Sequence, residues 1–274
     1  MELEDKVVVV TGGAKGIGRA LAEAFLADGA RAVAIVDLGA ADVEATATEL
    51  GERAVGIAAD VSDRAAVVAL VADVEDKLGP IDLFVSNAGI GSGAGIEATD
   101  GEWDRIWRVN VLAHVHAAAA VLPSMLARGE GYLLSTASAA GLLTQIGDLP
   151  YSVTKHAAVS VAEWLAITYG DRGIKVSCLC PQGVNTDLLG SVAGHSSVET
   201  VRAQGVIEPA EVAAAVVAGL ADETFLILPH PEVAEYYRRR AVDPDRWLAG
   251  MARLQARILG AIGDAPPPVE GASG

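Results

Sequence analysis

Two side chains that can exchange protons, Tyr151 and Lys155, lie four residues apart in the sequence. On a helix this spacing places both on one face, so the phenol would lie beside the ammonium group. A free phenol has a pKa of about 10, and a neighbouring cation favours the phenolate. Such a pair can exchange a proton with an alcohol or a ketone near neutral pH. The spacing alone is weak, because many helices carry Tyr and Lys four residues apart as a surface pair.

A hydroxyl group, that of Ser138, lies thirteen residues before Tyr151. It can hydrogen-bond a substrate oxygen and hold that oxygen near the phenol. Ser135 and Thr136 are alternative hydroxyls, but they belong to the strand that leads to this point. The sequence context after Ser138, two alanines and a glycine, favours Ser138.

The scaffold for these residues is predicted from short apolar runs that alternate with segments of helical periodicity. Runs rich in Val, Ile and Leu without polar alternation predict parallel strands that are buried on both faces. They cover residues 7–10, 32–36, 54–58, 81–85, 132–134 and 176–179, and a seventh run covers 225–228. Helices are predicted near 17–28, 41–50, 63–78, 102–127 and 152–170, with another that begins at Pro209. This rhythm predicts an α/β fold with a doubly wound parallel sheet.

Composition narrows the functional class. Of 274 residues, 51% are apolar, which is ample for a buried core, and the formal charge of −16 disfavours nucleic acid and anionic membranes as partners. Cys178 and Cys180 alternate along a predicted strand, so we interpret them as core residues and predict no metal site. The acidic N-terminus is unlike a signal peptide, and no apolar run approaches the length of a membrane span. We therefore expect a cytoplasmic protein.

A glycine-rich turn joins the first strand to the first helix. Gly12 permits a tight turn, Gly16 permits close approach of a pyrophosphate, and Gly18 permits close packing of helix on strand. The helix N-terminus attracts an anion through its free N–H groups and its dipole. Lys15 and Ile17 complete the turn. With a strand before it and a helix after it, the motif predicts a dinucleotide site.

Cofactor choice depends on two residues that act in opposite directions. Asp37 ends the second strand, where a carboxylate accepts hydrogen bonds from adenosine ribose and repels a 2′-phosphate. Lys15 in the glycine turn can attract that phosphate, contact the pyrophosphate or extend into solvent. Asp37 has the more directional position, so NAD is predicted, with NADP as the alternative.

In chain order these motifs resemble those of the short-chain dehydrogenase/reductase family. The resemblance covers about residues 5–229 and includes Thr11 to Gly18, Asp60-Val61, Asn87-Ala88-Gly89, Asn110, Ser138, Tyr151, Lys155 and Pro181 to Thr186. It implies a single Rossmann-type domain of about seven strands in three layers over residues 1–262, with the core at 5–229 and a helical extension at 230–262. It also implies an NAD(P)-dependent enzyme that acts on CH–OH groups.

The resemblance implies a role for each matching residue. Tyr151 would be the general acid or base, Lys155 would lower its pKa and bind the nicotinamide ribose, and Ser138 would orient the substrate oxygen. Asn110 would support a proton relay through water, although a structural Asn at a helix bend is the alternative. The implied cofactor contacts are Gly12, Lys15, Gly16, Ile17, Gly18, Asp37, Leu38, Asp60, Val61, Asn87, Ala88, Gly89, Tyr151, Lys155, Pro181, Gly183, Val184 and Thr186.

Three other functions stay open at this point. The first is an NADP-dependent ketone reductase of the same family. The second is a cofactor-bound sensor or scaffold without turnover, which the intact Ser138, Tyr151, Lys155 and Asn110 disfavour. The third is a sugar-nucleotide epimerase, which would need a longer C-terminal substrate region.

The predicted substrate side departs from the family pattern. Gln182 follows Pro181 where the family commonly has glycine, and Gln145, Gln182 and Leu188 are candidate substrate contacts. Leu142, Leu143, Ile146 and Leu149 form either an apolar wall or core packing. The glycines and serines of 188–204 predict a lid, and His195 within it is interpreted as a solvated loop residue.

The C-terminal part is predicted to be a helix and then a tail. From Asp243 and Pro244 onward, Trp247, Met251, Leu254 and Ile258 form one apolar stripe. This stripe can pack on its own domain, cover the substrate pocket or reach another subunit. Residues 263–274 carry three consecutive prolines and are predicted to be disordered. Residues 111–122 and the helix after Tyr151 match the helices through which family members associate, so a homotetramer or dimer is expected, although residues 117–120 can instead pack within the chain.

Overall fold

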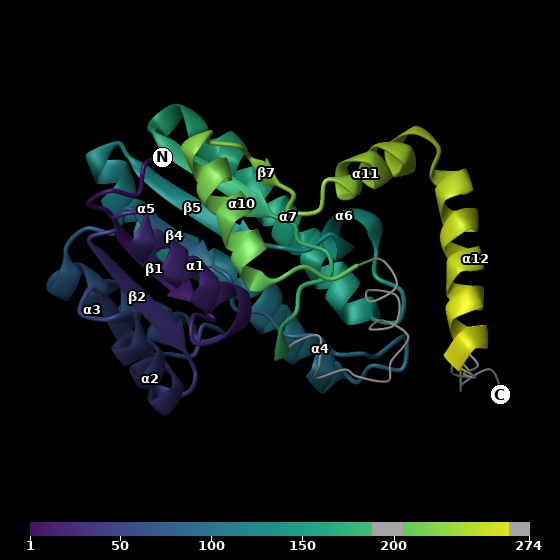
Figure 1. The fold of residues 1–274 in the computed structure, drawn as a ribbon, viewed down its shortest axis with the longest axis horizontal. Helices are drawn as coiled ribbons and strands as arrows, with labels where there is room; N and C mark the ends of the chain where they lie inside the picture. The colour runs from purple at the N-terminus through teal and green to yellow at the C-terminus, as the bar shows by residue number, and fades with distance from the viewer. Residues whose placement is uncertain (188–204, 263–274) are drawn as a thin grey trace.

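The computed structural model describes residues 1–187 and 205–262 and contains a seven-stranded sheet (Figure 1). The strand order is β3-β2-β1-β4-β5-β6-β7, and all neighbouring strands are parallel. The strands are β1 (Val7–Thr11), β2 (Ala32–Asp37), β3 (Ala54–Ala58), β4 (Leu83–Ser86), β5 (Gly131–Thr136), β6 (Ile174–Leu179) and β7 (Leu226–Ile227). The predicted doubly wound parallel sheet is confirmed.

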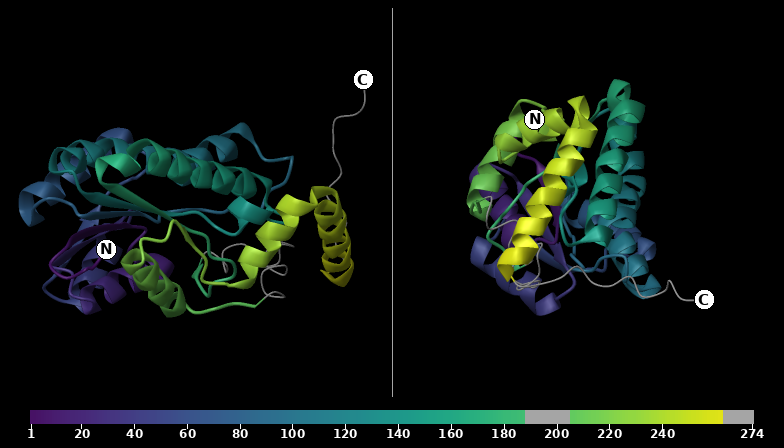
Figure 2. Two further views of the ribbon diagram at one scale, coloured as in Figure 1. Left: turned by 90° about the horizontal axis from the view of Figure 1, so that it is seen from above. Right: turned by 90° about the vertical axis from the view of Figure 1, so that its right-hand side faces the viewer.

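Helices cover both faces of this sheet and give three layers (Figure 2). The N-terminal and central helices are α1 (Gly16–Ala27), α2 (Ala40–Leu50), α3 (Arg64–Leu78), α4 (Asp100–Trp107), α5 (Ala113–Arg128), α6 (Ala140–Leu143) and α7 (Leu149–Tyr169). The later ones are α10 (Pro209–Ala221), α11 (Glu232–Val242) and α12 (Pro244–Ile262). One core cluster joins α1, α2 and α10 to the sheet, and a second joins α3, α5 and α7 to its opposite face.

The two core clusters follow from the alternation of side chains along buried strands. Val7 and Val9 of β1 belong to the cluster under α3, α5 and α7, whereas Val8 and Val10 belong to the cluster under α1 and α10. A strand with apolar residues at every position can be covered on both faces, as the sequence predicts for parallel strands. For β3 this prediction is wrong. Gly56 and Ala58 are exposed, because β3 is the edge strand of the sheet.

The predicted helix at 102–127 consists of three segments. Between α4 and α5 the chain forms a π-helical turn, η1 (Arg108–Leu112), which contains Asn110. A π-turn interrupts the regular i→i−4 hydrogen bonds and is frequent at functional sites. Helical periodicity does not reveal such a local widening, so the sequence predicts one continuous helix.

The stretch Asp100–Arg128 also corrects the prediction about membrane spans. By length and apolar composition it could cross a membrane, and it is the one such helix in the described residues. In the structure it packs on α3, β4 and β5 as a core helix of the sheet layer. Half of its apolar window is buried within the fold.

The sequence predicts a helical extension at 230–262, and the structure contains two helices there, α11 and α12. α12 begins at Pro244 as predicted, whereas α11 has only Val233 buried and therefore shows no apolar stripe. Trp247 of α12 packs on Tyr236 of α11, with ring centroids 6.3 Å apart. Figure 1 shows α12 at the edge of the molecule, beyond α11. Of the stripe residues, Trp247 thus contacts a helix of its own chain, α11.

The switch in strand order lies between β1 and β4, because the chain winds from β1 through β2 to β3 and then returns to β4. Crossover loops leave a crevice at such a point, at the carboxyl ends of the strands. The predicted glycine turn follows β1 and Asn87 follows β4, so both lie at this crevice. The predicted lid at 188–204, with Leu188 and His195, and the tail at 263–274 lie outside the described residues.

Candidate active site

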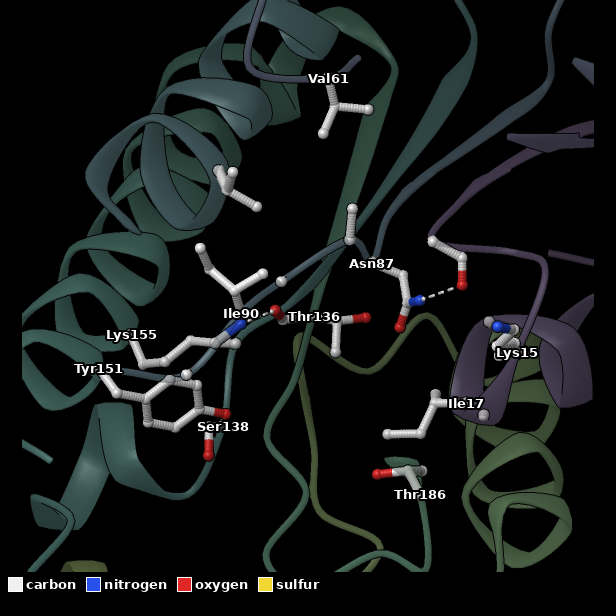
Figure 3. Close-up of a pocket in the computed structure, with 18 of the residues that line it drawn as sticks. Lys15, Ile17, Val61, Asn87, Ile90, Thr136, Ser138, Tyr151, Lys155 and Thr186 are labelled. Atoms are coloured by element: carbon white, nitrogen blue, oxygen red, sulfur yellow. Dashed lines mark hydrogen bonds between the residues drawn. The ribbon is translucent and has the colours of Figure 1, made fainter. Parts of the chain in front are cut away.

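A cavity of about 620 Å³ lies at the carboxyl ends of the central strands (Figure 3). Most of the residues that the sequence singles out line it. They are Gly12, Lys15, Gly16, Ile17, Gly18, Asp37, Leu38, Asp60, Val61, Asn87, Ala88, Gly89, Ser138, Gln145, Tyr151, Lys155, Pro181, Gln182, Val184 and Thr186. Residues more than 170 positions apart in the chain thus share one cavity.

The described lining does not include Asn110 or Gly183. Other residues that the sequence analysis did not select do line the cavity, namely Ala59, Ser62, Ile90, Gly91, Asp104, Arg105, Arg108, Val109, Thr136, Ala137, Asp148 and Asp187. The sequence indicates that Asp148 begins a helix, because an acidic residue shortly before a Pro marks a helix start. Leu142 and Leu143 pack in the core cluster of α3, α5 and α7, so core packing explains them.

The glycine turn has a backbone geometry that favours glycine. Gly12 and Gly16 have φ angles of +62° and +53°, which side chains rarely permit. A Cβ on Gly18 would lie 2.1 Å from the Gly12 carbonyl oxygen. Lys15 is the N-cap residue of α1, but no side chain caps this helix and its first turn carries no acidic residue.

Three helices differ from α1 at this point, whereas α2, like α1, has no side-chain cap. Side chains of Asp63, Thr99 and Asp148 cap α3, α4 and α7. The N–H groups at the start of α1 therefore stay available for an anion, and the helix dipole favours negative charge there. These features fit a dinucleotide cofactor.

Asn87 and Thr11 fasten the ends of β4 and β1 together. The Asn87 Nδ2 group donates to the carbonyl oxygens of Thr11 at 3.0 Å and Gly12 at 3.3 Å. Thr11 Oγ1 donates to Val85 O and accepts from the backbone nitrogens of Asn87 and Ala88. This network fixes the backbone on both sides of the cavity floor.

At the other end of the cavity, Asp37 and Lys15 are both held by neighbours. Asp37 accepts hydrogen bonds from the backbone nitrogens of Leu38 at 2.8 Å and Ala14 at 3.3 Å. The Lys15 ammonium lies 3.3 Å from a carboxylate oxygen of Asp42. The carboxylate of Asp42 thus competes with any phosphate for this lysine.

The Tyr151 hydroxyl lies beside Ser138 in the cavity (Figure 3). Burial raises the pKa of Tyr151 to about 12, and a hydrogen bond with Ser138 acts in the opposite direction. Ser138 Oγ also accepts from the Ala140 backbone nitrogen at 3.1 Å and donates to the Pro181 carbonyl oxygen at 3.4 Å. The serine hydroxyl is therefore oriented toward both the tyrosine and the segment that contains Gln182.

Lys155 is buried, and its ammonium lies 5.6 Å from the centre of the Tyr151 ring. It donates to the Thr136 carbonyl oxygen at 3.0 Å, and burial lowers its pKa to about 8. Its charge is not among the main influences on the pKa of Tyr151. Desolvation of the phenol is the largest influence on that pKa, and its lowering by Lys155 stays a prediction.

Asn110 is fully buried in η1, behind the cavity. Its Oδ1 atom accepts from the Ile90 nitrogen at 2.9 Å, and its Nδ2 group donates to the Ile90 carbonyl at 2.9 Å and to Thr154 Oγ1 at 3.2 Å. These bonds join the loop after β4 to η1 and α7, as the structural interpretation of Asn110 requires. Gly89 separates it from Lys155, since a Cβ there would lie 3.2 Å from Lys155 Nζ and 3.4 Å from Asn110 Oδ1.

A buried histidine, His230, holds the segment from Pro181 to Gly183. Its Nδ1 atom accepts from the Gln182 backbone nitrogen at 3.2 Å, and its Nε2 atom lies 3.1 Å from the Gly183 carbonyl oxygen. Since Nδ1 accepts, Nε2 carries the proton and donates. No local pattern in the sequence predicts this contact, because His230 lies 47 residues after Gly183.

A second contact from the C-terminal extension reaches the start of the tyrosine helix. Arg240 on α11 donates to the Leu142 carbonyl oxygen and lies 3.1 Å from His156 Nε2. His156 in turn contacts the Ser152 carbonyl oxygen through Nδ1 at 2.8 Å. The extension is therefore bonded to α6 and α7, on either side of Gln145.

This cavity, with a Tyr–Lys pair and a glycine turn on a doubly wound sheet, is that of a short-chain dehydrogenase. The model of the short chain dehydrogenase family matches residues 6–196, more than half of the chain, so the protein belongs to this family.

Related proteins and solved structures support membership of the same family. The chain is 33% identical to 2-(S)-hydroxypropyl-CoM dehydrogenase 3 of Xanthobacter autotrophicus over 238 residues, or 82% of this chain and 93% of the relative. It is 38% identical to sorbitol dehydrogenase of Cereibacter sphaeroides over 66% of this chain and 71% of the relative. A short chain dehydrogenase/reductase from Burkholderia phymatum in complex with NAD superposes with a TM-score of 0.83 and 28% identity, over 89% of this chain and 96% of the other. The protein is thus an oxidoreductase that acts on CH–OH groups.

Proposed function

We propose that the protein is an NAD-dependent dehydrogenase that interconverts a secondary alcohol and its ketone, with Tyr151 as general acid and base. The observation that carries this proposal is the contact of Tyr151 with Ser138 in the same cavity as the uncapped N-terminus of α1. Tyr151 exchanges a proton with the substrate, and the N-terminus of α1 provides an anion site for a dinucleotide.

Each of the site residues has a separate role in the proposed reaction. Ser138 donates to the substrate oxygen and holds it next to the phenol. During oxidation Tyr151 takes the hydroxyl proton of the alcohol, and during reduction it returns a proton to the ketone oxygen. When bound, the nicotinamide cofactor supplies or accepts the hydride. Lys155 binds the nicotinamide ribose, and Asn110 supports the helix turn and loop that position Lys155.

A preference for NAD is supported by two carboxylates near the glycine turn. Asp37 ends β2 at the cavity, where it can accept from ribose hydroxyls and would repel a 2′-phosphate. Lys15 is paired with Asp42, which weakens the attraction that favoured NADP in the sequence analysis. Lys15 and Asp42 are both exposed, so their ion pair has a small effect on the preference for NAD over NADP, and Asp37 has the larger effect.

The substrate is a small alcohol or ketone that enters next to Gln145 and Gln182, both of which line the cavity. Their amides can donate to and accept from neutral hydroxyl or carbonyl groups of the substrate. The names of related dehydrogenases for sorbitol and meso-2,3-butanediol support a substrate with more than one oxygen.

We also expect a homo-oligomer in the cytoplasm. Trp164 and Ile167 on α7 are 57% and 82% exposed, and Val115 on α5 is 40% exposed. Large apolar groups at the surface of the two helices that the sequence analysis selected support association there. Cys178 and Cys180 are free thiols, which fits a reducing compartment.

The test is a spectrophotometric assay of the purified protein with NAD or NADP and a panel of secondary alcohols and diols. We expect reduced nicotinamide to form with NAD at a higher kcat/KM than with NADP. Cofactor binding without turnover across the panel would contradict the proposed activity, and a preference for NADP would contradict the assignment of Asp37.

A further inference from the structure

Asp148 is a buried carboxylate that the proposed proton transfer does not use. It lies three residues before Tyr151, at the start of α7, and is only 6% exposed. A buried charge is costly unless hydrogen-bond donors surround it. The donors around Asp148 therefore show which parts of the molecule it connects.

Four donors from two separate segments surround this carboxylate. Oδ2 accepts from the backbone nitrogens of Ser92 at 3.0 Å and Gly93 at 2.8 Å. Oδ1 accepts from Ser92 Oγ at 2.6 Å and from the Tyr151 backbone nitrogen at 3.1 Å. Next to it, the Leu149 nitrogen donates to the Ala94 carbonyl oxygen at 2.9 Å.

The segment at 91–95 needs such an anchor. It contains three glycines and one alanine, so Ser92 is its one polar side chain, and Gly93 has a φ angle of +65°. Glycines leave a chain conformationally free, and side chains do not fix its path. Gly91 lines the cavity together with Tyr151 and Asp148, so the path of this segment determines the shape of the cavity wall.

We propose that Asp148 is a positioning residue whose carboxylate clamps the segment at 91–95, as a wall of the substrate side, against the start of the tyrosine helix. The assignment of this wall to the substrate rests on the proposed function. The clamp itself rests on the four hydrogen bonds and can be tested separately.

The same carboxylate acts on Tyr151 through its charge. Besides burial, Ser138, Asp148 and Cys180 influence the pKa of Tyr151, and the Lys155 ammonium lies 5.6 Å from the centre of its ring. Burial is the main cause of the raised pKa of Tyr151; the hydrogen bond with Ser138 lowers it, and the negative charge of Asp148 raises it further. Removal of that charge must lower the pKa of Tyr151. Since oxidation uses the phenolate, its rate would then rise at lower pH than in the unmodified protein.

Three substitutions separate these effects. Asp148→Asn removes the charge and presents an N–H group where the backbone donors of 91–95 need an acceptor. Asp148→Ser keeps a capping oxygen for α7, but the serine side chain is too short to reach Ser92 and Gly93. This variant replaces Asp148→Asn in the experiments if Asp148→Asn does not fold. Ser92→Ala removes the hydrogen bonds of Ser92 Oγ with Asp148 Oδ1 and with the Ala94 nitrogen and leaves the charge in place. Asp63→Asn is the matched control, because Asp63 caps α3 through Ala65 and does not line the cavity.

The first measurement is hydrogen exchange of the Ser92 and Gly93 amides, which needs no turnover. Asp148→Asn and Asp148→Ser should speed this exchange about tenfold or more, because charged hydrogen bonds are lost. Ser92→Ala and Asp63→Asn should leave the Gly93 exchange nearly unchanged. Unaltered exchange in both Asp148 variants would overturn the clamp, whether or not the protein turns over an alcohol.

The second measurement is the pH profile of alcohol oxidation with NAD. In both Asp148 variants we expect the KM for the alcohol to rise about tenfold while the KM for NAD changes little. We also expect the rising limb of the pH profile of oxidation to move to lower pH. Ser92→Ala should raise the alcohol KM less and leave the pH midpoint in place. Equal changes in both KM values, or a midpoint that moves to higher pH, would contradict the inference. Absence of turnover in the unmodified protein would contradict the proposed function and leave the exchange result to decide the clamp.

Discussion

The cofactor end and the substrate end of the cavity are built in different ways. The cofactor end consists mainly of backbone, since glycines with positive φ angles, the bare N-terminus of α1 and the β1–β4 junction shape it. At the substrate end, single buried side chains hold segments that have little structure of their own. Asp148 holds 91–95, and His230 holds the turn from Pro181 to Gly183.

This difference has a physical consequence. The glycine turn of the cofactor end consists of residues close together in sequence, and the contact of Asn87 with Thr11, 76 residues away, joins it to β4. A site held by distant side chains depends on contacts such as that of Arg240 with the Leu142 carbonyl, 98 residues away. Substitution there should change substrate kinetics while cofactor binding persists.

The largest effect is expected where the two ends meet. Tyr151→Phe removes the proton donor and acceptor, so kcat should fall by about 10²- to 10⁴-fold. The NAD dissociation constant, measured by titration calorimetry, should change little, because the cofactor end does not depend on the phenol. Retention of more than a tenth of the activity would sink the assignment of Tyr151.

A smaller effect is expected within the cofactor end. Asp37→Ala should reduce the ratio of kcat/KM for NAD over NADP by roughly tenfold or more, since hydrogen bonds of ribose to a carboxylate are lost. Asp42→Ala should reduce the same ratio by less, because it only frees Lys15. If the ratio is unchanged in both variants, other residues set the cofactor preference.

At the substrate end, His230→Ala should lower kcat/KM for the alcohol by about tenfold, through loss of two hydrogen bonds. Asn can replace the Nδ1 acceptor and Gln the Nε2 donor, so His230→Asn and His230→Gln should each restore part of the loss. Thermal unfolding of all three variants provides the control for global stability. Equal kinetics in all three would indicate that the histidine only fills space.

The smallest effect is expected for α12. Deletion of residues 244–274 removes the packing of Trp247 on Tyr236 but keeps Arg240 and His230. Kinetic constants should change less than about twofold, because in the described part of the chain the cavity lining ends at Asp187 and the contacts of His230 and Arg240 lie before Pro244. A large rise in the alcohol KM would instead give α12 or the following tail a direct role at the substrate site.

The features that the sequence predicts are mostly local patterns, and those that it does not predict depend mostly on tertiary contacts. The strands, the glycine turn, Asp37 and the Tyr151–Lys155 spacing are local patterns, and they predict the sheet and most of the cavity lining. The π-turn around Asn110, the exposure of β3 and the bounds of helix α11 were not predicted, because they depend on tertiary context or lack periodicity. His230 and Arg240 were missed because only the folded chain brings them into contact with segments that lie next to the cavity. The pKa directions of Tyr151 and Lys155 depend on burial, which spacing does not show.

The central claim is that this cavity oxidises a secondary alcohol by direct hydride transfer while Tyr151 handles the proton. The most direct test uses NAD and an active alcohol from the panel carrying deuterium on the carbinol carbon, with mass spectrometry of the nicotinamide product. We predict reduced nicotinamide that carries one deuterium from the substrate, and almost none formed by Tyr151→Phe in the same time. Reduced nicotinamide without deuterium, or equal amounts from both proteins, would contradict the account.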